Sequence, residues 1–489
     1  MTAPPSIIAG IRRTARSGDT LRAWQMFEAA DLLDSVDPDV LSLRGRLLKD
    51  RGLKASGRDR ARLLDEAAAA YLASVGERRA TYPLINAATI AFLNGKAGDA
   101  ERLALWTIEL LDSGDHEPET PYWLAATRAE AAFLLGDFES GRAALDQAIA
   151  VAPDAWEDQA ATLRQLEALL ARAGWPTELL EPLRPPPSLH FGGLIGLASD
   201  DRRTIAAIER LLDEIRPGFV YGALAAGTDI VVAELALARG ARLHAVLPTS
   251  IGAFRAQSVA RYGVDWAVRF DRLIELASEV EILAEHDHFS QAGVVLSEDV
   301  AMGLAIRRSR ALASRAFALR VRRASDPPAV SDLAWQALGL PLREIVVERS
   351  ETAAADDGAI GAPRAVLAFN QIALDPTPLP AGTVGGSVAG SAILVVPDLA
   401  AAVDFAITRL AAQPGIQAGL DYRVIDGGSD PLGEAAELAM HLARAAPAGA
   451  ILAACPGALA VDLRAPGISF EANGEIITPV GNVAVSIYQ

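Results

Sequence analysis

The sequence contains a single cysteine, Cys455, among 489 residues. One thiol cannot form an internal disulfide, and it excludes zinc and iron–sulfur sites that need several cysteine ligands. We expect Cys455 to be a small buried apolar residue. Lysine is also scarce, because only Lys49, Lys54 and Lys96 accompany the many arginines.

Apolar runs long enough to cross a membrane are also missing. Hydrophobic residues make up 51% of the chain, but a charge, proline or glycine interrupts every run before it reaches about 18 residues. Residues 1–19 lack the basic region, apolar core and small-residue cleavage site of a secretory signal. We therefore expect a cytoplasmic protein that makes no membrane contact.

Acidic residues outnumber basic ones and give a formal net charge of −17. A surface of this sign repels the phosphate backbone of nucleic acids, so we do not expect nucleic-acid binding.

The chain is too long for one typical core, and its length predicts about three domains.

Residues 1–184 are predicted to form an all-α domain of helical hairpins, because apolar residues recur at three- and four-residue spacing. In the clearest unit, Tyr122 to Asp154, alanines let two helices approach closely and Gly136 lies in the turn. An earlier copy places Gly95 at the equivalent turn, and a weaker third copy covers residues 15–30, with its turn at 17–19.

These copies resemble tetratricopeptide repeats. The resemblance implies a solenoid of stacked hairpins whose concave surface binds a protein partner. A scaffold role, in which the helices only support the rest of the chain, remains an alternative.

Three consecutive prolines at 185–187 interrupt the helical pattern and mark the first boundary. From 188 to 350, short apolar strands alternate with amphipathic helices, which predicts a parallel sheet covered by helices on both faces. Ligands of such sheets bind at the carboxyl ends of the strands. The small, acidic residues of 351–363 are predicted to form a linker.

Residues 218–248 are predicted to form a strand, a glycine turn, a helix and a second strand over 242–247. Gly227 allows a tight turn or close approach to a ligand, and Thr228 is expected to cap a helix that starts at Asp229. The turn lacks the lysine of a P-loop, and it does not match the GxGxxG motif of dinucleotide-binding domains.

The segment LAAGTDIVVAELALARGARLHAVLP resembles the Rossmann-like nucleotide-binding domains of the SLOG family, which includes DprA and the LOG phosphoribohydrolases. A later segment, VARYGVDWAVRFDRLIELASEV, resembles the subgroup attached to tetratricopeptide repeats in bacterial signalling proteins. The resemblance implies a nucleotide or nucleotide-derived ligand, with its phosphate over the amides of 227–230. The residues predicted to bind this ligand are Gly192, Gly193, Gly222, Ala226, Gly227, Thr228, Asp229, Glu234 and Pro248.

Catalysis by this domain is an alternative to binding alone. LOG enzymes use a PGGxGTxxE motif, which this sequence lacks. Glu234, one turn into the helix, is either a ligand for a ribose hydroxyl or a solvated helix carboxylate. Hydrolysis of an N-glycosidic bond in a nucleotide, with Glu234 or Asp229 as the acid, therefore remains open.

Residues 364–489 are predicted to form an α+β domain with a mixed or antiparallel sheet, and they resemble class III nucleotide cyclases. The best match is IQAGLDYRVID…GEAAELAMHLARAAPAGAILA, in which Gly433 and Gly449 keep the spacing of the family. Cyclase domains of this class usually pair with one another. The resemblance therefore implies a possible homodimer through the C-terminal domain.

Cyclase chemistry needs two aspartates that hold two metal ions. The positions of these aspartates are taken by Asn370 and Gln371 and by Gly390 and Ser391, and Glu437 and His441 replace the asparagine and arginine of the catalytic helix. A histidine cannot form the arginine fork to phosphate. The resemblance therefore implies a degenerate, inactive cyclase-like domain.

No other catalytic or metal-binding set can be assembled from the sequence. The segment Glu285-His286-Asp287-His288 fits a solvated loop better than a metal site, so we expect no metal and no cofactor. The sequence thus predicts a multidomain regulatory protein that binds a nucleotide-derived small molecule and a protein partner. A nucleotide hydrolase and a scaffold without ligand are the alternatives.

Overall fold

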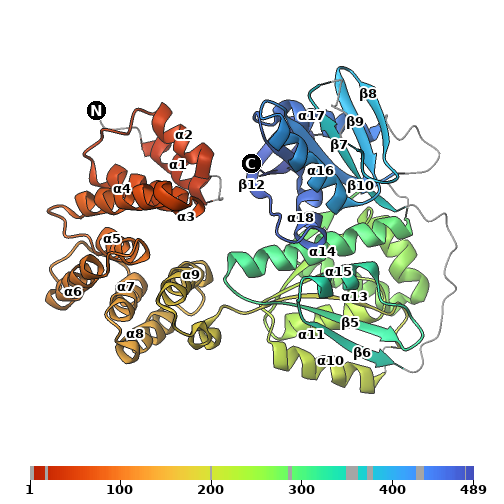
Figure 1. Ribbon diagram of the computed structural model, residues 1–489. Helices are drawn as coiled ribbons and strands as arrows, with labels where there is room; N and C mark the ends of the chain where they lie inside the picture. Colours follow the sequence, from red (N-terminus) through yellow and green to blue (C-terminus); the bar gives the residue numbers. More distant parts are fainter. Residues whose placement is uncertain are drawn as a thin grey trace. The chain divides into compact units, whose positions relative to one another are not determined.

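The computed structural model describes residues 5–16, 20–198, 201–284, 289–347, 362–371, 378–425, 434–479 and 481–488. The chain divides into two compact units, Met1–Pro185 and Pro186–Gln489. The first unit is helical, and the second contains two β-sheets with their covering helices (Figure 1).

The first unit is built from consecutive helices that pack in pairs, α3 with α4, α5 with α6 and α7 with α8. This confirms the predicted helical hairpins. The helices are α1 (Pro5–Arg16), α2 (Thr20–Ala29), α3 (Pro38–Lys54), α4 (Gly57–Val75), α5 (Thr81–Leu93), α6 (Ala97–Ser113), α7 (Pro121–Leu134), α8 (Phe138–Val151) and α9 (Trp156–Ala173), followed by the 3-10 helix η1 (Thr177–Leu183).

The turns between paired helices are equivalent in two of the predicted copies. Gly95 follows α5 with a φ of 80°, and Gly136 follows α7 with a φ of 77°. Both angles lie in the left-handed region that glycine adopts without strain. Ala88 and Ala129, on the helices before these turns, are fully buried, which allows close helix packing. The predicted turn of the third copy, 17–19, lies outside the described residues.

The second unit begins with a parallel six-stranded sheet of order β4-β3-β2-β1-β5-β6. The chain adds β2 to β4 on one side of β1 and then returns to add β5 and β6 on the other side. The predicted parallel sheet is thereby confirmed. Its strands are β1 (Ser188–Gly193), β2 (Phe219–Gly222), β3 (Arg242–Leu247), β4 (Glu279–Ile282), β5 (Ala316–Arg323) and β6 (Leu342–Val347).

Helices cover both faces of this sheet. On one face α11 packs on β1, β2 and β3 and contacts α10 and α13, while on the other α14 packs on β1, β2, β3 and β5 and contacts α15. The central strands are apolar because both of their faces are buried. The helices are α10 (Arg202–Ile215), α11 (Thr228–Ala238), α12 (Ile251–Phe254), α13 (Val264–Leu276), α14 (Gln291–Ala311) and α15 (Val330–Ala337).

The second sheet has seven strands in the order β12-β13-β11-β10-β7-β9-β8, with β10 and β11 parallel and the other pairs antiparallel. Its α17 packs on one face, and α16 and α18 pack on the other. The elements are β7 (Pro363–Phe369), β8 (Val384–Val388), β9 (Ser391–Val396), α16 (Leu399–Ala412), β10 (Ala418–Val424), α17 (Glu434–Ala445), β11 (Ile451–Ala454), α18 (Cys455–Arg464), β12 (Glu471–Thr478) and β13 (Gly481–Tyr488).

Two elements of this region were not expected from the sequence. Strand β8, whose glycines and serine favour a bend, is exposed and pairs only with β9 among the described strands. Helix α18 follows β11 directly, and Cys455 at its first position is half-buried rather than fully buried as expected.

The two sheets of the second unit are joined where α14 crosses α18. The backbones approach so closely that a Cβ on Gly303 would lie 2.1 Å from the carbonyl oxygen of Leu459. Ion pairs flank this contact, because Arg307 and Arg310 of α14 both bind the buried Asp462 of α18. In the described part of the chain, no helix is long and apolar enough to span a membrane.

Candidate functional site

A cavity of about 90 Å³ lies at the carboxyl ends of the first three strands of the parallel sheet. Its walls come from the end of β1, the turn after β2, the start of α11, the segments after β3 and β4, and the first half of α14. The lining residues are His190, Phe191, Gly192, Gly193, Ile195, Ala223, Ala225, Asp229, Pro248, Phe254, Ser258, Phe289, Val294, Ser297, Glu298 and Ala301.

The residues predicted to bind a ligand divide into two groups. Four of them line the cavity, namely Gly192, Gly193, Asp229 and Pro248. The others, Gly222, Ala226, Gly227, Thr228 and Glu234, are not part of its described lining.

Two of these outer glycines are required by backbone packing. A Cβ on Gly222 would lie 2.6 Å from the carbonyl oxygen of Phe191, on the neighbouring strand. Gly227 has a φ of 106°, and its Cβ would lie 2.6 Å from the amide nitrogen of Leu197. The close approach predicted for these glycines is therefore to the chain itself, in the segment that follows β1.

The start of α11 differs from the prediction. The helix begins at Thr228 with Gly227 as its N-cap, and the Thr228 hydroxyl is buried without a hydrogen-bond partner. Thr228 therefore does not cap the helix, which corrects the sequence-based expectation. Instead, the Thr228 amide donates to the carbonyl of Leu194 at 3.2 Å, and the Ala225 amide donates to the carboxylate of Asp229 at 3.2 Å.

Asp229 is a buried carboxyl group at the cavity wall, with 7% of its surface exposed. Burial raises the pKa of Asp229 to about 7, although the Ala225 amide and the charge of Arg320 oppose this shift. A carboxyl group with this pKa exchanges protons near neutral pH.

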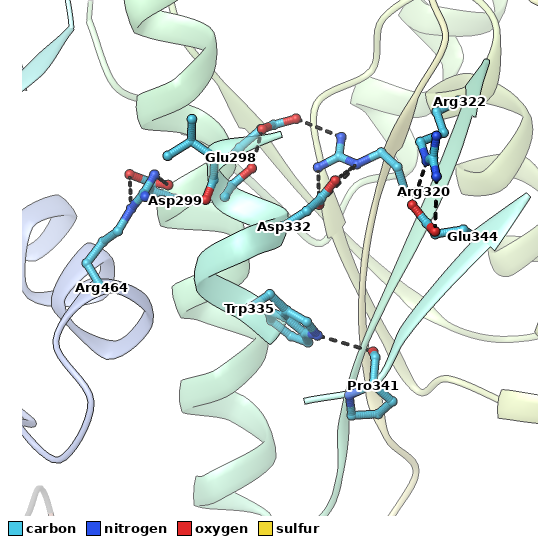
Figure 2. Close-up of polar contacts among 11 residues, drawn as sticks. Glu298, Asp299, Arg320, Arg322, Asp332, Trp335, Pro341, Glu344 and Arg464 are labelled. Carbon is cyan, nitrogen blue, oxygen red and sulfur yellow. Dashed lines mark hydrogen bonds and ion pairs between the residues drawn. The ribbon is translucent and has the colours of Figure 1, made fainter. Parts of the chain in front are cut away.

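Glu298 on α14 is the second carboxyl group of the cavity. It accepts a hydrogen bond from Arg320 at 2.8 Å and another from Ser331 at 2.6 Å. Arg320 in turn binds Asp332 of α15 through contacts of 2.7 and 2.9 Å (Figure 2). Burial acts to raise the pKa of Glu298, but the charge of Arg320 and the hydrogen bonds from Arg320 and Ser331 act together in the other direction, and this pKa lies below its ordinary value. Glu298 is therefore ionised at neutral pH.

His190 is the third polar group at the wall, with 2% of its surface exposed. Burial, together with the nearby charge of Arg320, lowers the pKa of His190 to about 3, so its ring is neutral. Its Nδ1 atom is buried and has no hydrogen-bond partner among the residues that the structure describes. Buried polar atoms are nearly always paired, so an unpaired nitrogen at a cavity wall is a candidate for ligand contact.

Glu234 lies outside the cavity and forms an ion pair. Its carboxylate accepts hydrogen bonds of 2.9 and 2.6 Å from Arg269 of α13. Of the two roles predicted for Glu234, this arrangement fits a helix carboxylate without a ligand better than a ligand for a ribose hydroxyl.

The polar residues that shape the cavity were missed by sequence reasoning, apart from Asp229. His190 lies inside a strand, and Arg320 and Asp332 come from separate elements that only the fold brings together. One local signal was present, since Glu298 and Asp299 interrupt the small and apolar sequence that α14 has over 292–306.

The positions at which the sequence resemblance to cyclases would place the catalytic residues lie at the end of β7 and in the turn between β8 and β9. Asn370 and Gln371, at the end of β7, donate to Gln417 at 2.6 Å and to Gln413 at 2.7 Å. Gly390 lies in the turn between β8 and β9, with Ser391 buried after it.

On α17 the ring of His441 contacts the carbonyl of Glu437 at 2.9 Å. Residue 433 and the segment 285–288 lie outside the described residues. Within the described residues, no group of three or more His, Cys, Asp or Glu side chains could hold a metal ion.

Comparison with known proteins identifies the helical unit. The family model described as Tetratricopeptide Repeats-Sensor matches residues 10–91, which span most of α1 to α5. This match supports the predicted tetratricopeptide-type repeats in the first part of the N-terminal unit. No curated protein matches the chain.

Among solved structures, a point mutant of the Thermobaculum terrenum O-GlcNAc transferase is similar at 14% identity, covering 70% of this chain. The present chain spans only 56% of the length of that structure, and the TM-score is 0.17. A score this low carries no argument about a shared fold or activity.

Proposed function

We propose that this protein is a regulatory ligand sensor, which binds a nucleotide or nucleotide-derived molecule in the parallel-sheet domain (188–350) and a protein partner through its repeats (1–184). The observation that carries the proposal is the cavity at the carboxyl ends of β1 to β3. It is bordered by the buried carboxyl group of Asp229, the partly buried carboxyl group of Glu298 and a buried imidazole nitrogen without a partner among the described residues. Groups of this kind are expensive to bury, so a cavity that gathers them is typical of a binding site.

Helix α14 offers a route from the ligand to the C-terminal domain. Its Glu298 lines the cavity, whereas the adjacent Asp299 binds Arg464 of α18. A ligand that shifts α14 would change how α18 packs on it, because the two backbones are in contact at Gly303. The repeats would present the resulting state to the partner.

The C-terminal domain (364–489) is proposed to be a cyclase-like domain without activity that supports this response. The absence of carboxylates at the metal positions, where Asn370 and Gln371 pair with other amides, supports an inactive domain. Pairing of two such domains in a homodimer remains part of the proposal.

The repeats carry an apolar surface suited to a protein contact. On α6, Leu105 is 54% exposed and Trp106 is 37% exposed, and both line a shallow groove with Glu101, Arg102 and Glu109. Exposed aromatic and aliphatic side chains in a polar rim are typical of protein interfaces. The match to a tetratricopeptide family supports the same role.

A second candidate function is hydrolysis of an N-glycosidic bond. The observation that favours it is the contrast between the two carboxyl groups of the cavity, since the pKa of Asp229 is raised to about 7 and that of Glu298 is lowered. In many enzymes two neighbouring carboxyl groups have different pKa values. The group with the higher pKa donates a proton, and the ionised group stabilises positive charge. Asp229 would then be the proton donor.

Thermal-shift screening of the full chain with nucleosides and nucleotides, followed by chromatography of each mixture, separates these functions. A stabilising compound recovered intact supports the sensor. Conversion of that compound to free base supports the hydrolase. No stabilisation by any compound contradicts both and leaves the scaffold alternative.

A further inference from the structure

The described lining of the cavity offers hydrogen-bond acceptors but no positive charge. Among the lining residues that the structure describes, Asp229 and Glu298 are acidic and none is lysine or arginine. The guanidinium of Arg320, which contacts Glu298 of the cavity wall, is also held by Asp332. A phosphate in this cavity would therefore face carboxyl groups without a cation to offset them.

Three main-chain amides before and at the start of α11 already have acceptors. The Ala225 amide donates to Asp229, the Ala226 amide donates to the Ser258 carbonyl at 3.0 Å, and the Thr228 amide donates to the Leu194 carbonyl. Anions bind at helix starts because such amides are free to point at them. Here the carboxylate of Asp229 takes the position of the anion.

The remaining wall suits a flat, apolar ring. Phe191, Phe254 and Phe289 line the cavity, and Phe254 lies with its ring centroid 6.4 Å from that of Phe289. Aromatic side chains bind nucleobases through their faces and edges, with little dependence on phosphate. The unpaired Nδ1 of His190 adds one further hydrogen-bonding position at the same wall.

From this combination we infer that the cavity binds a nucleobase through adjacent N–H donors, as guanine presents at its ring and exocyclic nitrogens, and that any phosphate of the ligand stays outside. Asp229 and Glu298 accept these donors, and the phenylalanines hold the ring. The inference rests on the proposed ligand-binding function and specifies which end of the ligand enters. It replaces the expectation of a phosphate over residues 227–230.

Isothermal titration calorimetry of the full chain with guanosine, GMP, adenosine, AMP and ribose 5-phosphate tests this orientation. We expect guanosine to bind within about threefold of GMP and at least about tenfold more tightly than adenosine, and ribose 5-phosphate not to bind. Binding of ribose 5-phosphate, or of nucleotides about tenfold more tightly than their nucleosides, would overturn the inference while leaving the sensor proposal intact. If none of the five compounds binds, the inference fails, and the wider nucleotide screen decides the sensor proposal separately.

Matched variants connect this binding to the two carboxyl groups. Glu298→Gln and Asp229→Asn keep the side-chain shapes but lose an acceptor, so each should weaken guanosine binding at least about tenfold. Glu234→Gln, on α11 but outside the described lining, is the control and should bind normally. The melting temperature without ligand identifies a variant that fails to fold. In that case the guanosine affinity of the other variant tests the assignment. Unchanged guanosine affinity in a folded variant would refute the assignment.

Discussion

Arg464 of α18 binds Asp299 of α14 through hydrogen bonds of 2.6 and 3.0 Å, and the Asp299 carboxylate is completely buried (Figure 2). The hydroxyl of Tyr422 donates to the same carboxylate at 3.2 Å. Burial nevertheless raises the pKa of Asp299 to about 6. Because Glu298 is the preceding residue, consecutive positions of one helix line the cavity and contact the C-terminal domain.

Removing the charge of Asp299 should loosen the C-terminal domain. Asp299→Asn leaves Arg464 buried without a charged partner, a change that costs about 3–5 kcal/mol in buried pairs. We expect faster amide hydrogen exchange in α18 and a lower unfolding midpoint in urea. Asp271→Asn, which removes an exposed pair with Arg255, is the control and should change little. Equal exchange in α18 for both variants would contradict this role.

The backbone contact between α14 and α18 predicts that Gly303 does not tolerate a side chain. Gly303→Ala places its Cβ 2.1 Å from the Leu459 carbonyl, so the helices must separate, at a cost of about 1–3 kcal/mol. Gly252→Ala, on α12 with no atom near its added Cβ, serves as the matched control. Thermal unfolding of both proteins measures the difference, and similar melting temperatures would rule out the close contact.

Gly227 is predicted to be a structural glycine. Gly227→Ala combines a φ of 106° with contacts below 3 Å to the backbone of residues 194–197. Gly240→Ala has a φ of 84° but no close contact, so it isolates the backbone strain, which costs about 1 kcal/mol. We expect the melting temperature to fall further for Gly227→Ala than for Gly240→Ala. A smaller fall in melting temperature for Gly227→Ala than for Gly240→Ala would show that the segment after β1 can move away from the added Cβ.

The raised pKa of Asp229 predicts a stability difference that depends on pH. The group binds a proton more tightly in the folded state, with a pKa of about 7, than at its ordinary value of 3.8. Its stabilising contribution is therefore complete below about pH 4 and is lost as the pH rises through 7. Arg320 remains charged across this range.

Asp229→Asn cannot titrate and supplies the comparison. The melting temperature of the wild type should fall relative to this variant between pH 4 and pH 7, while the contribution of Asp299 is common to both proteins. Parallel melting curves across this range would show that Asp229 is not perturbed by burial.

The sequence by itself determined the local elements of this protein. Periodic apolar residues and the glycines at 95 and 136 were sufficient to predict paired helices, because both signals act within one hairpin. The strand over 242–247 begins and ends where it was predicted, and its apolar residues 245–247 are buried on both faces. Gly227 was recognised as a special position, although its close contact is with the chain.

The tertiary structure decided which polar groups meet. Glu298, Arg320 and Asp332 come from three elements, and Arg464 reaches Asp299 across 165 positions of sequence. Strand β8 was missed because it depends on its partner, and α18 because it is short. No local pattern encodes these pairings, since they depend on which helices cross and which strand ends adjoin after the chain has folded.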